Sequence, residues 1–281
     1  MAVDLHVHSS ASDGSETPTR LVELAVAQRL TAMALTDHDT LEGWTEAETA
    51  ARHTGLRLIP GTELSLEHEG GMHLVVLWLR PGKGPLQDRL ASLQRGRLDR
   101  NARILEALAA AGIEITDEEV AAQSGGGTIG RPHIAAVMMN KGYVPDIGTA
   151  FELWLGRGRP GYATRPRLNP GEAIGLARES GAVPILGHPH TLGISRAEDM
   201  ARVLVDLRGH GLVGLEAIYS SYHRHEREGY ADLARRFDLV PTGGSDYHGS
   251  YKPGLSVGLG YGDLYVPDSV VEELAEHAAE P

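Results

Sequence analysis

Short apolar runs alternate with longer helical segments along most of this chain, and this alternation restricts the possible folds more than any other feature. Each run has the length of a single buried strand. The expected strands cover residues 2–8, 32–36, 56–60, 73–79, 183–186, 213–218 and 239–242. Strands separated by helices form parallel sheets, because each helix carries the chain back to the start of the next strand. The sequence therefore predicts an α/β fold.

Helix-end signals support the segments between these strands. Thr17 precedes Pro18 and Asn169 precedes Pro170, the order of an N-cap residue followed by proline in the first helical turn. Glycines follow four helical runs, where a left-handed residue closes the helix; they are Gly55, Gly112, Gly181 and Gly211. The expected helices of the alternating part are 18–29, 41–53, 169–180, 197–210, 222–237 and 267–278.

One long stretch lacks strand signals. Between residues 81 and 165 the pattern predicts helices 86–111, 117–122, 132–141 and 147–155, bounded by segments rich in Pro and Gly. We therefore expect an α/β domain formed by residues 1–82 and 166–281. Residues 83–165 would form a helical insertion that caps the substrate.

Composition limits the chemistry and the partners. The formal net charge of -12 argues against binding to long nucleic acid or to a membrane. The chain contains no cysteine, so any metal must be held by imidazole and carboxylate groups, which suit Mn, Fe, Co or Zn. No apolar stretch approaches the roughly 18 residues of a membrane-spanning helix, and no signal-peptide pattern is visible. A cytoplasmic location is the default expectation.

Histidines and carboxylates recur at the ends of the apolar runs. His6 and His8 are two residues apart on an expected strand and therefore project from the same face. Carboxyl ends of parallel strands meet at one mouth of a barrel, so residues at these ends converge. The nine residues concerned are His6, His8, Asp13, His38, Glu63, His73, His188, Asp246 and His248. Only His73, at the start of its run, fits this scheme poorly. The pattern predicts a multinuclear metallohydrolase.

The motifs that carry these residues resemble those of the PHP (polymerase and histidinol phosphatase) phosphoesterases. They read Asp-Leu-His-Val-His-Ser, Ser-Asp-Gly, Thr-Asp-His-Asp, Gly-Thr-Glu, Gly-His-Pro and Gly-Gly-Ser-Asp-Tyr-His, together with His73. The resemblance covers about residues 1–80 and 168–250. It implies a distorted (β/α)7 barrel, similar to a TIM barrel, with three divalent metal ions; Mn is the first expectation, and Fe or Zn the alternatives.

The resemblance also implies how the ligands divide among the ions. The first ion would take His6, His8, Glu63 and Asp246; the second would share Glu63 and add His73 and His188; the third would take Asp13, His38 and His248. Three divalent ions against three carboxylates leave a positive site that suits a phosphate ester. A hydroxide bridging two ions is the expected nucleophile, because metals lower the pKa of bound water.

Three polar residues beside these ligands have more than one interpretation. Asp37 and Asp39 flank His38, where they could orient an imidazole or cap the helix that begins near residue 41. His190 could protonate the leaving alkoxide, contact phosphate or cap the following loop. We place Asp37 and His190 in the candidate catalytic set.

The expected insertion contributes candidates for binding the substrate. Arg131 and His133 open a predicted helix, whose N-terminus favours anions, and Arg157 and Arg159 lie in the basic loop that ends the insertion. All four could bind phosphate, although basic loops are also commonly solvated. Tyr143, Trp154 or Tyr162 could stack on a base, and packing is the alternative for Trp154.

The insertion motifs resemble those of stand-alone PHP proteins that act on nucleotides. This resemblance implies a phosphatase that removes the 3'-phosphate of adenosine 3',5'-bisphosphate, giving AMP and phosphate. A histidinol phosphatase and a 5'-to-3' exonuclease acting on short oligoribonucleotides are the alternatives. An amidohydrolase and a structural module without activity belong to other classes; the first requires fewer metal ligands, and the second commonly lacks some of them. The expected partner is a small phosphorylated molecule, and the sequence leaves the oligomeric state open.

Overall fold

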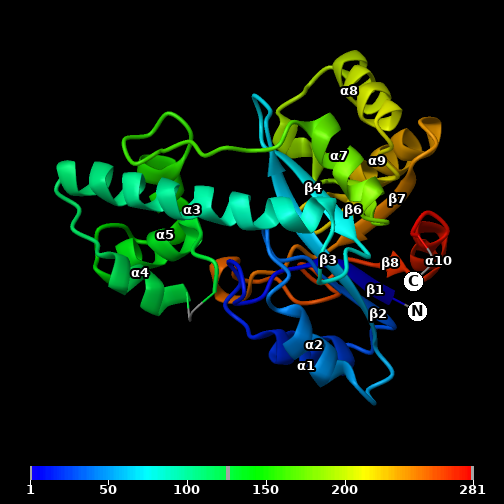
Figure 1. The fold of residues 1–281 in the computed structure, drawn as a ribbon, viewed down its shortest axis with the longest axis horizontal. Coiled ribbons are helices and arrows are strands. Elements are labelled where there is room, and N and C mark those ends of the chain that lie inside the picture. The colour runs from blue at the N-terminus through cyan, green and yellow to red at the C-terminus, as the bar shows by residue number, and fades with distance from the viewer. Residues whose placement is uncertain (1, 125–126, 280–281) are drawn as a thin grey trace.

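The computed structural model describes residues 2–124 and 127–279, and eight strands form its sheet. Their order is β7-β6-β5-β4-β3-β2-β1-β8. The sheet nearly closes on itself, because the backbone N–H of His8 donates to the carbonyl of Tyr247 (3.0 Å) just after β7. The α/β, barrel-like fold is thus confirmed (Figure 1). The strands are β1 (Ala2–Val7), β2 (Ala32–Leu35), β3 (Arg57–Leu66), β4 (Met72–Leu77), β5 (Val183–Gly187), β6 (Gly214–Tyr219), β7 (Val240–Gly244) and β8 (Val266–Pro267).

Strand β4 departs from the expected parallel sheet, because it runs antiparallel to both β3 and β5. The connection from β3 is only residues 67–71, which is too short for the crossover that a parallel pair requires. His73, near the start of β4, therefore pairs with Gly187 at the end of β5. This reversal explains why a residue at the beginning of an apolar run still reaches the mouth of the barrel.

Strand β3 is longer than the sequence indicated, and Glu63 lies within it rather than after it. Its first half, to Pro60, pairs with β2, and its second half, from Gly61, pairs with β4. A Cβ at Gly61 would lie 2.8 Å from the carbonyl oxygen of Val76. Pro60, the expected end of this strand, thus marks the point where β3 changes partner.

Both expected N-caps and three of the four expected C-terminal glycines are confirmed. The side chain of Thr17 accepts a hydrogen bond from the N–H of Arg20 (3.1 Å), and Asn169 accepts one from the N–H of Gly171 (2.9 Å). The four expected C-terminal glycines all have positive φ, but Gly55 lies three residues beyond Arg52, the C-cap of the helix that it was expected to close. These helices are α1 (Pro18–Ala27), α2 (Trp44–Ala51), α7 (Pro170–Glu179), α8 (Ala197–Gly209), α9 (Arg224–Arg236) and α10 (Ser269–Ala275).

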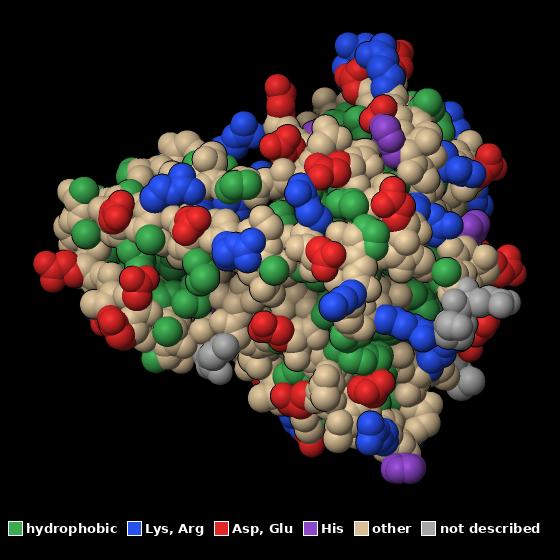
Figure 2. Space-filling view, in the orientation of Figure 1, with side chains coloured by type: hydrophobic (Ala, Val, Ile, Leu, Met, Phe, Trp, Pro, Cys, Tyr) green, Lys and Arg blue, Asp and Glu red, His purple; other side chains and the backbone are tan. Residues whose placement is uncertain are grey.

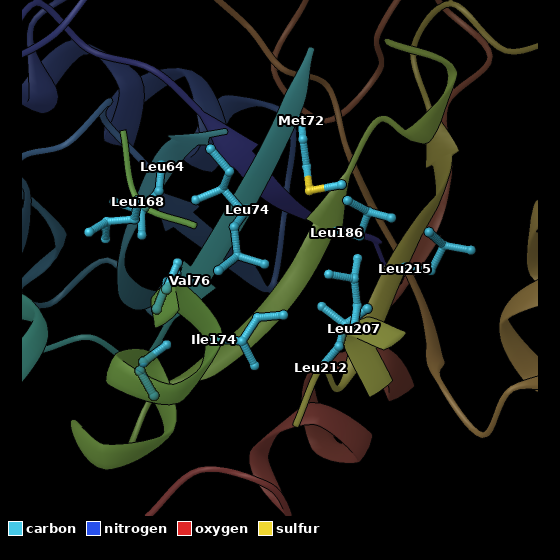
Figure 3. Close-up of a cluster of buried hydrophobic side chains, with 14 of the residues drawn as sticks. Leu64, Met72, Leu74, Val76, Leu168, Ile174, Leu186, Leu207, Leu212 and Leu215 are labelled. Atoms are coloured by element: carbon cyan, nitrogen blue, oxygen red, sulfur yellow. The ribbon is translucent and has the colours of Figure 1, made fainter. Parts of the chain in front are cut away.

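Alternate residues of the central strands pack into two apolar clusters on opposite faces. Leu74 and Leu186 face the cluster formed with α7 and α8 (Figure 3), whereas Val75 and Ile185 face a second cluster. Glu63 has the same parity along β3 as Ile59, which belongs to the second cluster. The polar mouth described below is therefore built above this second apolar layer.

The stretch without strands is helical, as expected. It contains α3 (Pro85–Ala110), α4 (Asp117–Ser124), α5 (Arg131–Asn140), α6 (Ile147–Ala150) and a π-helical turn (Phe151–Leu155). Figure 1 shows α3 leading away from the sheet toward α4 and α5. Leu86 and Leu90 at the start of α3 belong to the barrel's apolar cluster, while Ile104 and Leu108 belong to a separate insertion cluster. One continuous helix thus belongs to both cores. The domain boundaries near residues 82 and 166 stay a prediction.

The surface mixes charges of both signs. On the face in Figure 2, acidic and basic side chains alternate over the barrel and over α3. Within the described residues, none of the helices combines the length and the apolar character needed to cross a bilayer.

Candidate metal centre and arginine pocket

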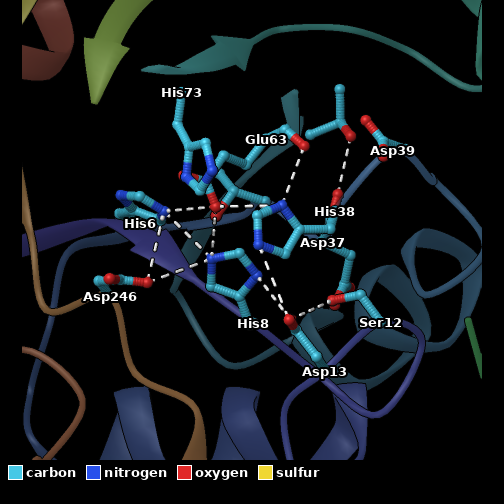
Figure 4. Close-up of polar contacts among 12 residues, drawn as sticks. His6, His8, Ser12, Asp13, Asp37, His38, Asp39, Glu63, His73 and Asp246 are labelled. Carbon is cyan, nitrogen blue, oxygen red and sulfur yellow. Dashed lines mark hydrogen bonds and ion pairs between the residues drawn. The ribbon is translucent and has the colours of Figure 1, made fainter. Parts of the chain in front are cut away.

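The nine residues expected as metal ligands converge at one mouth of the barrel. Groups of three or four of them place one possible ligand atom each within 4.8 Å of one another, and His188 joins such a group with His6 and Glu216. Figure 4 shows side chains from β1, β3, β4 and the loops after β1, β2 and β7 directed toward a common centre; those labelled are His6, His8, Asp13, His38, Glu63, His73 and Asp246. Eight of the nine are buried, and His73 is partly exposed. Because the described chain supplies only nitrogen and oxygen donors here, the set fits divalent transition metals.

Glu63 lies at the centre of this cluster. Its Oε1 is 2.7 Å from His73 Nδ1 and 3.0 Å from His188 Nε2. Its Oε2 is 3.3 Å from His6 Nε2 and 3.2 Å from His8 Nε2. The two oxygens thus face two different sets of imidazoles, as a carboxylate that bridges two ions must do.

The remaining expected ligands surround Asp13. His38 Nε2 is 3.7 Å from Asp13 Oδ2, and His248 Nε2 is 3.4 Å from Asp13 Oδ1. His8 completes this group, since its Nδ1 is 3.6 Å from Asp13 Oδ1 and lacks a hydrogen-bond partner among the described residues. An unpartnered nitrogen in a buried ring, aimed at a carboxylate, is what a ligand set without its ion leaves behind. The sequence motifs did not indicate that His8 belongs to this group.

Electrostatics keeps the carboxylates ionised. Burial alone would raise the pKa of Glu63, but His38, His73 and His6 outweigh it and hold the pKa well below its usual range. His38 and His248 do the same for Asp13.

The pKa values of two imidazoles, His38 and His8, shift in opposite directions. Burial lowers the pKa of His38 to about 3, so this ring is neutral and able to bind a metal. Burial would lower the pKa of His8 too, but Asp246 and Glu63 raise it to about 9. A proton on His8 thus compensates the carboxylates where a cation otherwise would.

Three polar residues around the cluster were missed by the sequence analysis. Tyr219 Oη donates to Asp246 Oδ2 (2.7 Å), and the Lys252 ammonium forms an ion pair with the same oxygen. Glu216 is 3.0 Å from His6 Nδ1. A carboxylate in the middle of an apolar strand was the available signal for Glu216, because buried charges require partners.

Asp37 and Asp39 do neither of the things expected of them. Both oxygens of Asp37 accept hydrogen bonds from the loop after β1, with Ser9 Oγ at 2.7 Å and Ser12 Oγ at 2.6 Å. Helix α2 begins only at Trp44 and has no side-chain cap. Asp37 therefore fixes the loop that carries Asp13, because its acceptors are engaged by that loop.

His190 lies beside the candidate metal centre. Its ring centroid is 6.0 Å from that of His188, and its Nδ1 is 2.9 Å from Tyr222 Oη. Burial and the neighbouring His188 lower the pKa of His190. The ring is therefore largely neutral at pH 7.

A small arginine-lined cavity adjoins the metal ligands; we call it the arginine pocket. Its volume is about 170 Å³, and its lining includes His38, His73 and Asp13. Five guanidinium groups from α3, α5 and the chain before α7 complete it; they are Arg97, Arg100, Arg131, Arg165 and Arg167. A larger cavity of about 490 Å³ shares Arg131, Arg165 and Arg167 and extends toward residues 67–71.

Asp39 is the carboxylate that partners two of these arginines. It receives Arg97 Nε at 2.6 Å and Arg165 Nη2 at 2.7 Å. Arg97 Nη2, Arg165 Nη1 and Arg167 Nε are buried and lack hydrogen-bond partners among the described residues. Burial together with Arg97 and Arg131 lowers the pKa of Arg100 well below its usual range. Such crowding of like charges and unpartnered donors is typical of an anion-binding site.

The four substrate candidates from the sequence separate in the structure. Arg131 lines both cavities, while its Nη1 donates to the carbonyl of Leu155 (3.2 Å). Arg157 is exposed and lines the larger cavity, where it contacts the Glu69 carbonyl. Arg159 is exposed and lines neither cavity. His133 is buried, and its Nδ1 accepts the N–H of Gly130 (3.0 Å), which leaves Nε2 without a described partner.

The proposed aromatic contacts also separate. Tyr162 lines the larger cavity, whereas Trp154 packs against the insertion core. Tyr143 accepts a hydrogen bond from the N–H of Glu114 (3.2 Å) away from both cavities. Of the three, Tyr162 alone stands where a base could lie.

Known proteins with this architecture identify the family. The model of the PHP domain matches residues 4–138. The 3',5'-nucleoside bisphosphate phosphatase of Chromobacterium violaceum is 32% identical over 91% of this chain and 90% of its own length. The chain belongs to the PHP family. A 5'-3' exoribonuclease of Haemophilus influenzae is also related to this PHP protein, with 34% identity over 87% of this chain and 89% of the relative.

Solved structures agree with this assignment. One is a Bifidobacterium adolescentis protein described as a metal-dependent phosphoesterase by inference. It has a TM-score of 0.87 at 31% identity, and the match covers 99% of this chain and 96% of that protein. An amidohydrolase from Chromobacterium violaceum, solved with sulfate and without metal, has a TM-score of 0.88 at 30% identity. That match covers 100% of this chain and 98% of the amidohydrolase. The expected PHP resemblance is confirmed, and the protein is a metal-dependent phosphoesterase with several buried clusters of His, Asp and Glu.

Proposed function

We propose that this PHP protein removes the 3'-phosphate of a nucleoside 3',5'-bisphosphate, with adenosine 3',5'-bisphosphate as the preferred substrate and AMP and phosphate as the products. One observation carries the proposal. The arginine pocket shares His38, His73 and Asp13 with the candidate metal centre, so two anionic groups of one small molecule can be held side by side. The bisphosphate phosphatase activity of a relative of similar length supports the same substrate class.

The metal centre would hold three divalent ions, and Mn is the first choice. His6, His8, Glu63 and Asp246 would hold the first ion; Glu63, His73 and His188 the second; and Asp13, His38 and His248 the third. When bound, such ions supply Lewis acidity and lower the pKa of water toward neutrality. Six charges on the ions against three carboxylates would leave a positive centre that attracts a phosphate dianion.

The arginine pocket would hold the second phosphate. Arg97, Arg165 and Arg167 line the pocket, and each keeps a buried donor without a partner among the described residues, so a phosphate can accept hydrogen bonds without displacing a protein group. Arg131 would contact the phosphate at the junction of the two cavities. The ribose and base would then extend into the larger cavity beside Tyr162. In this arrangement Arg157 reaches only the far end of a substrate, and Arg159 has no role.

His190 and Asp37 would have different roles around the reacting phosphate. His190 is exposed beside His188, so it can contact the phosphate or the leaving oxygen. Because its lowered pKa leaves the ring mostly deprotonated at neutral pH, a hydrogen-bonding role is favoured over that of a general acid. Asp37 would act indirectly, by holding the loop that presents Asp13.

A second candidate activity is 5'-to-3' hydrolysis of short oligoribonucleotides. The larger cavity favours it, because about 490 Å³ next to the arginine pocket gives room for more than one phosphate group. The exoribonuclease relative supports it to a similar degree. Histidinol phosphatase activity would leave the arginine pocket unused, and amidohydrolase chemistry would leave part of the ligand set unused.

A phosphate-release screen with Mn tests the proposal. It would compare adenosine 3',5'-bisphosphate, adenosine 3'-monophosphate, AMP, a 5'-phosphorylated trinucleotide and histidinol phosphate. We expect the bisphosphate to have the highest kcat/KM and to give AMP. A higher kcat/KM for the trinucleotide, with release of mononucleotides from the 5' end, would replace the proposal with the exonuclease activity. The best turnover with histidinol phosphate would reject both.

A further inference from the structure

We infer that Glu216 is a positioning residue that connects two metal ligands belonging to different candidate ions, His6 and His188. Glu216 lies in the middle of β6 and is buried, although it was absent from the expected ligand set. The inference rests on the metal-binding roles proposed above for the two histidines. Glu216 would orient both ligands before any ion or substrate binds.

The first contact fixes the orientation of the His6 ring. His6 Nδ1 is 3.0 Å from Glu216 Oε1, while Nε2 is 3.3 Å from Glu63 Oε2 and 3.6 Å from Asp246 Oδ1. The nitrogen that faces the other ligands is therefore Nε2, so in the neutral form of the ring that binds a metal the proton must be on Nδ1. A carboxylate that accepts this proton selects the metal-binding tautomer and makes the other nitrogen more basic.

The second contact fixes the turn that presents His188. The backbone N–H of His188 donates to Glu216 Oε2 at 2.6 Å. His188 has φ 21°, in the region that residues other than glycine rarely adopt, and Pro189 follows it. A charge-assisted hydrogen bond helps to stabilise this conformation. The same turn directs His188 Nε2 to Glu63 Oε1, at 3.0 Å.

The two contacts together distinguish a positioning residue from a ligand. Each oxygen of Glu216 already accepts a hydrogen bond from a group outside the ring of facing ligand atoms. The oxygens of Glu63, by contrast, face imidazole nitrogens from five histidines. Nevertheless, one atom each of His6, His188 and Glu216 lies within 4.8 Å of the others, so direct ligation by Glu216 is the competing possibility.

Metal binding to the Glu216→Gln variant separates these possibilities without any substrate. Glutamine keeps the shape, but its single carbonyl oxygen can accept only one of the two hydrogen bonds. We expect Mn affinity to fall about 10–100-fold, the usual cost of removing a group that orients a ligand. The number of ions bound at saturating Mn should equal that of the wild type. Equilibrium dialysis with elemental analysis measures both quantities.

Two control variants show how the Mn binding of Glu216→Gln is to be interpreted. Thr242→Val changes a buried residue paired with Glu216 in the neighbouring strand and should leave affinity unchanged. Asp246→Asn removes a proposed ligand and should lower the number of ions bound. Unchanged affinity in Glu216→Gln would overturn the inference, and loss of one ion at saturation would make Glu216 a ligand instead.

A third variant keeps the inference testable if Glu216→Gln does not fold. Glu216→Asp keeps the charge but is one methylene shorter, so it too should bind Mn more weakly with unchanged stoichiometry; wild-type affinity would contradict us. Circular dichroism in the presence of a chelator should show both variants folded. Failure of the proposed substrate would appear only in the phosphate-release screen and would leave these binding results intact.

Discussion

At the scale of single residues, the candidate metal centre depends on residues that contact more than one neighbour. Glu63 faces five imidazoles, and His8 presents one nitrogen to each of two ligand groups. The motifs identified which residue types converge, because a strand with histidines two residues apart has to present both on one face. They could not indicate that His8 completes the group around Asp13, since that depends on the orientation of a ring.

Asp246→Asn should lower kcat by about 100-fold or more. The substitution keeps the shape but removes a charge from the proposed first ion, and loss of a ligand costs at least as much as loss of an orienting group. Steady-state phosphate release with Mn measures the effect. His210→Ala, on an exposed histidine of the barrel's outer surface, is the matched control and should keep wild-type kcat. Retained turnover in Asp246→Asn would contradict the ligand assignment.

Arg131→Ala should raise KM for adenosine 3',5'-bisphosphate about 10-fold to 100-fold. A hydrogen bond to a charged group contributes about 1.5–3 kcal/mol, and about 1.4 kcal/mol corresponds to a factor of ten. KM for adenosine 3'-monophosphate, which lacks the second phosphate, should change much less. Arg159→Ala is the control, because Arg159 lines neither cavity. Equal changes for both substrates would remove the proposed role of Arg131.

At the scale of elements, helix α3 joins the barrel to the insertion and brings two arginines to the pocket. Its first turns pack in the barrel core and its last turns in the insertion core. Asp39, which follows the metal-ligand motif of His38, anchors Arg97 of this helix and Arg165 of the returning chain. The positions of the helices were predictable from periodicity, although α2 and α10 are shorter than expected. This long-range ion cluster, by contrast, has no local sequence signal.

Asp39→Asn should lower the free energy of unfolding by about 3 kcal/mol, because breaking a buried ion pair leaves charges without compensation. Here two buried guanidinium groups would lose their carboxylate partner in a pocket that already holds three others. Urea denaturation followed by circular dichroism measures the change. Inorganic phosphate should restore part of the lost stability if the pocket binds anions. A variant as stable as the wild type would show that Asp39 does not hold these arginines.

At the scale of the whole molecule, burial of many ionisable groups at one mouth of the barrel couples metal binding to the release of protons. The folded pKa of His8 is raised from 6.5 to about 9, so its protonated form stabilises the metal-free fold fully below pH 6.5. That stabilisation is lost as pH rises through 9. His38 has the opposite sign: its folded pKa is lowered to about 3, so its contribution is present above pH 6.5 and is lost as pH falls toward 3.

Mn binding should therefore tighten as pH rises from 7 to 9, by up to about tenfold per pH unit for one displaced proton. The proton on His8 has to leave before its nitrogen can bind an ion. Isothermal titration calorimetry in buffers of different ionisation enthalpy measures the number of protons released. His8→Gln should reduce that number by about one at pH 8. Proton release that is the same at pH 7 and pH 9 would contradict the raised pKa.

The sequence alone determined the α/β alternation, the helical insertion and the identity of the nine converging side chains. The elements follow from local rules of periodicity and capping. The side chains follow from the requirement that polar residues at the ends of buried strands have partners, such as a shared metal site. The tertiary structure decided the direction of β4, the assembly of five arginines into one pocket and the two contacts of Glu216. Each of these depends on which distant segments become neighbours. Spacing along the chain does not encode that, because packing of the whole core selects it.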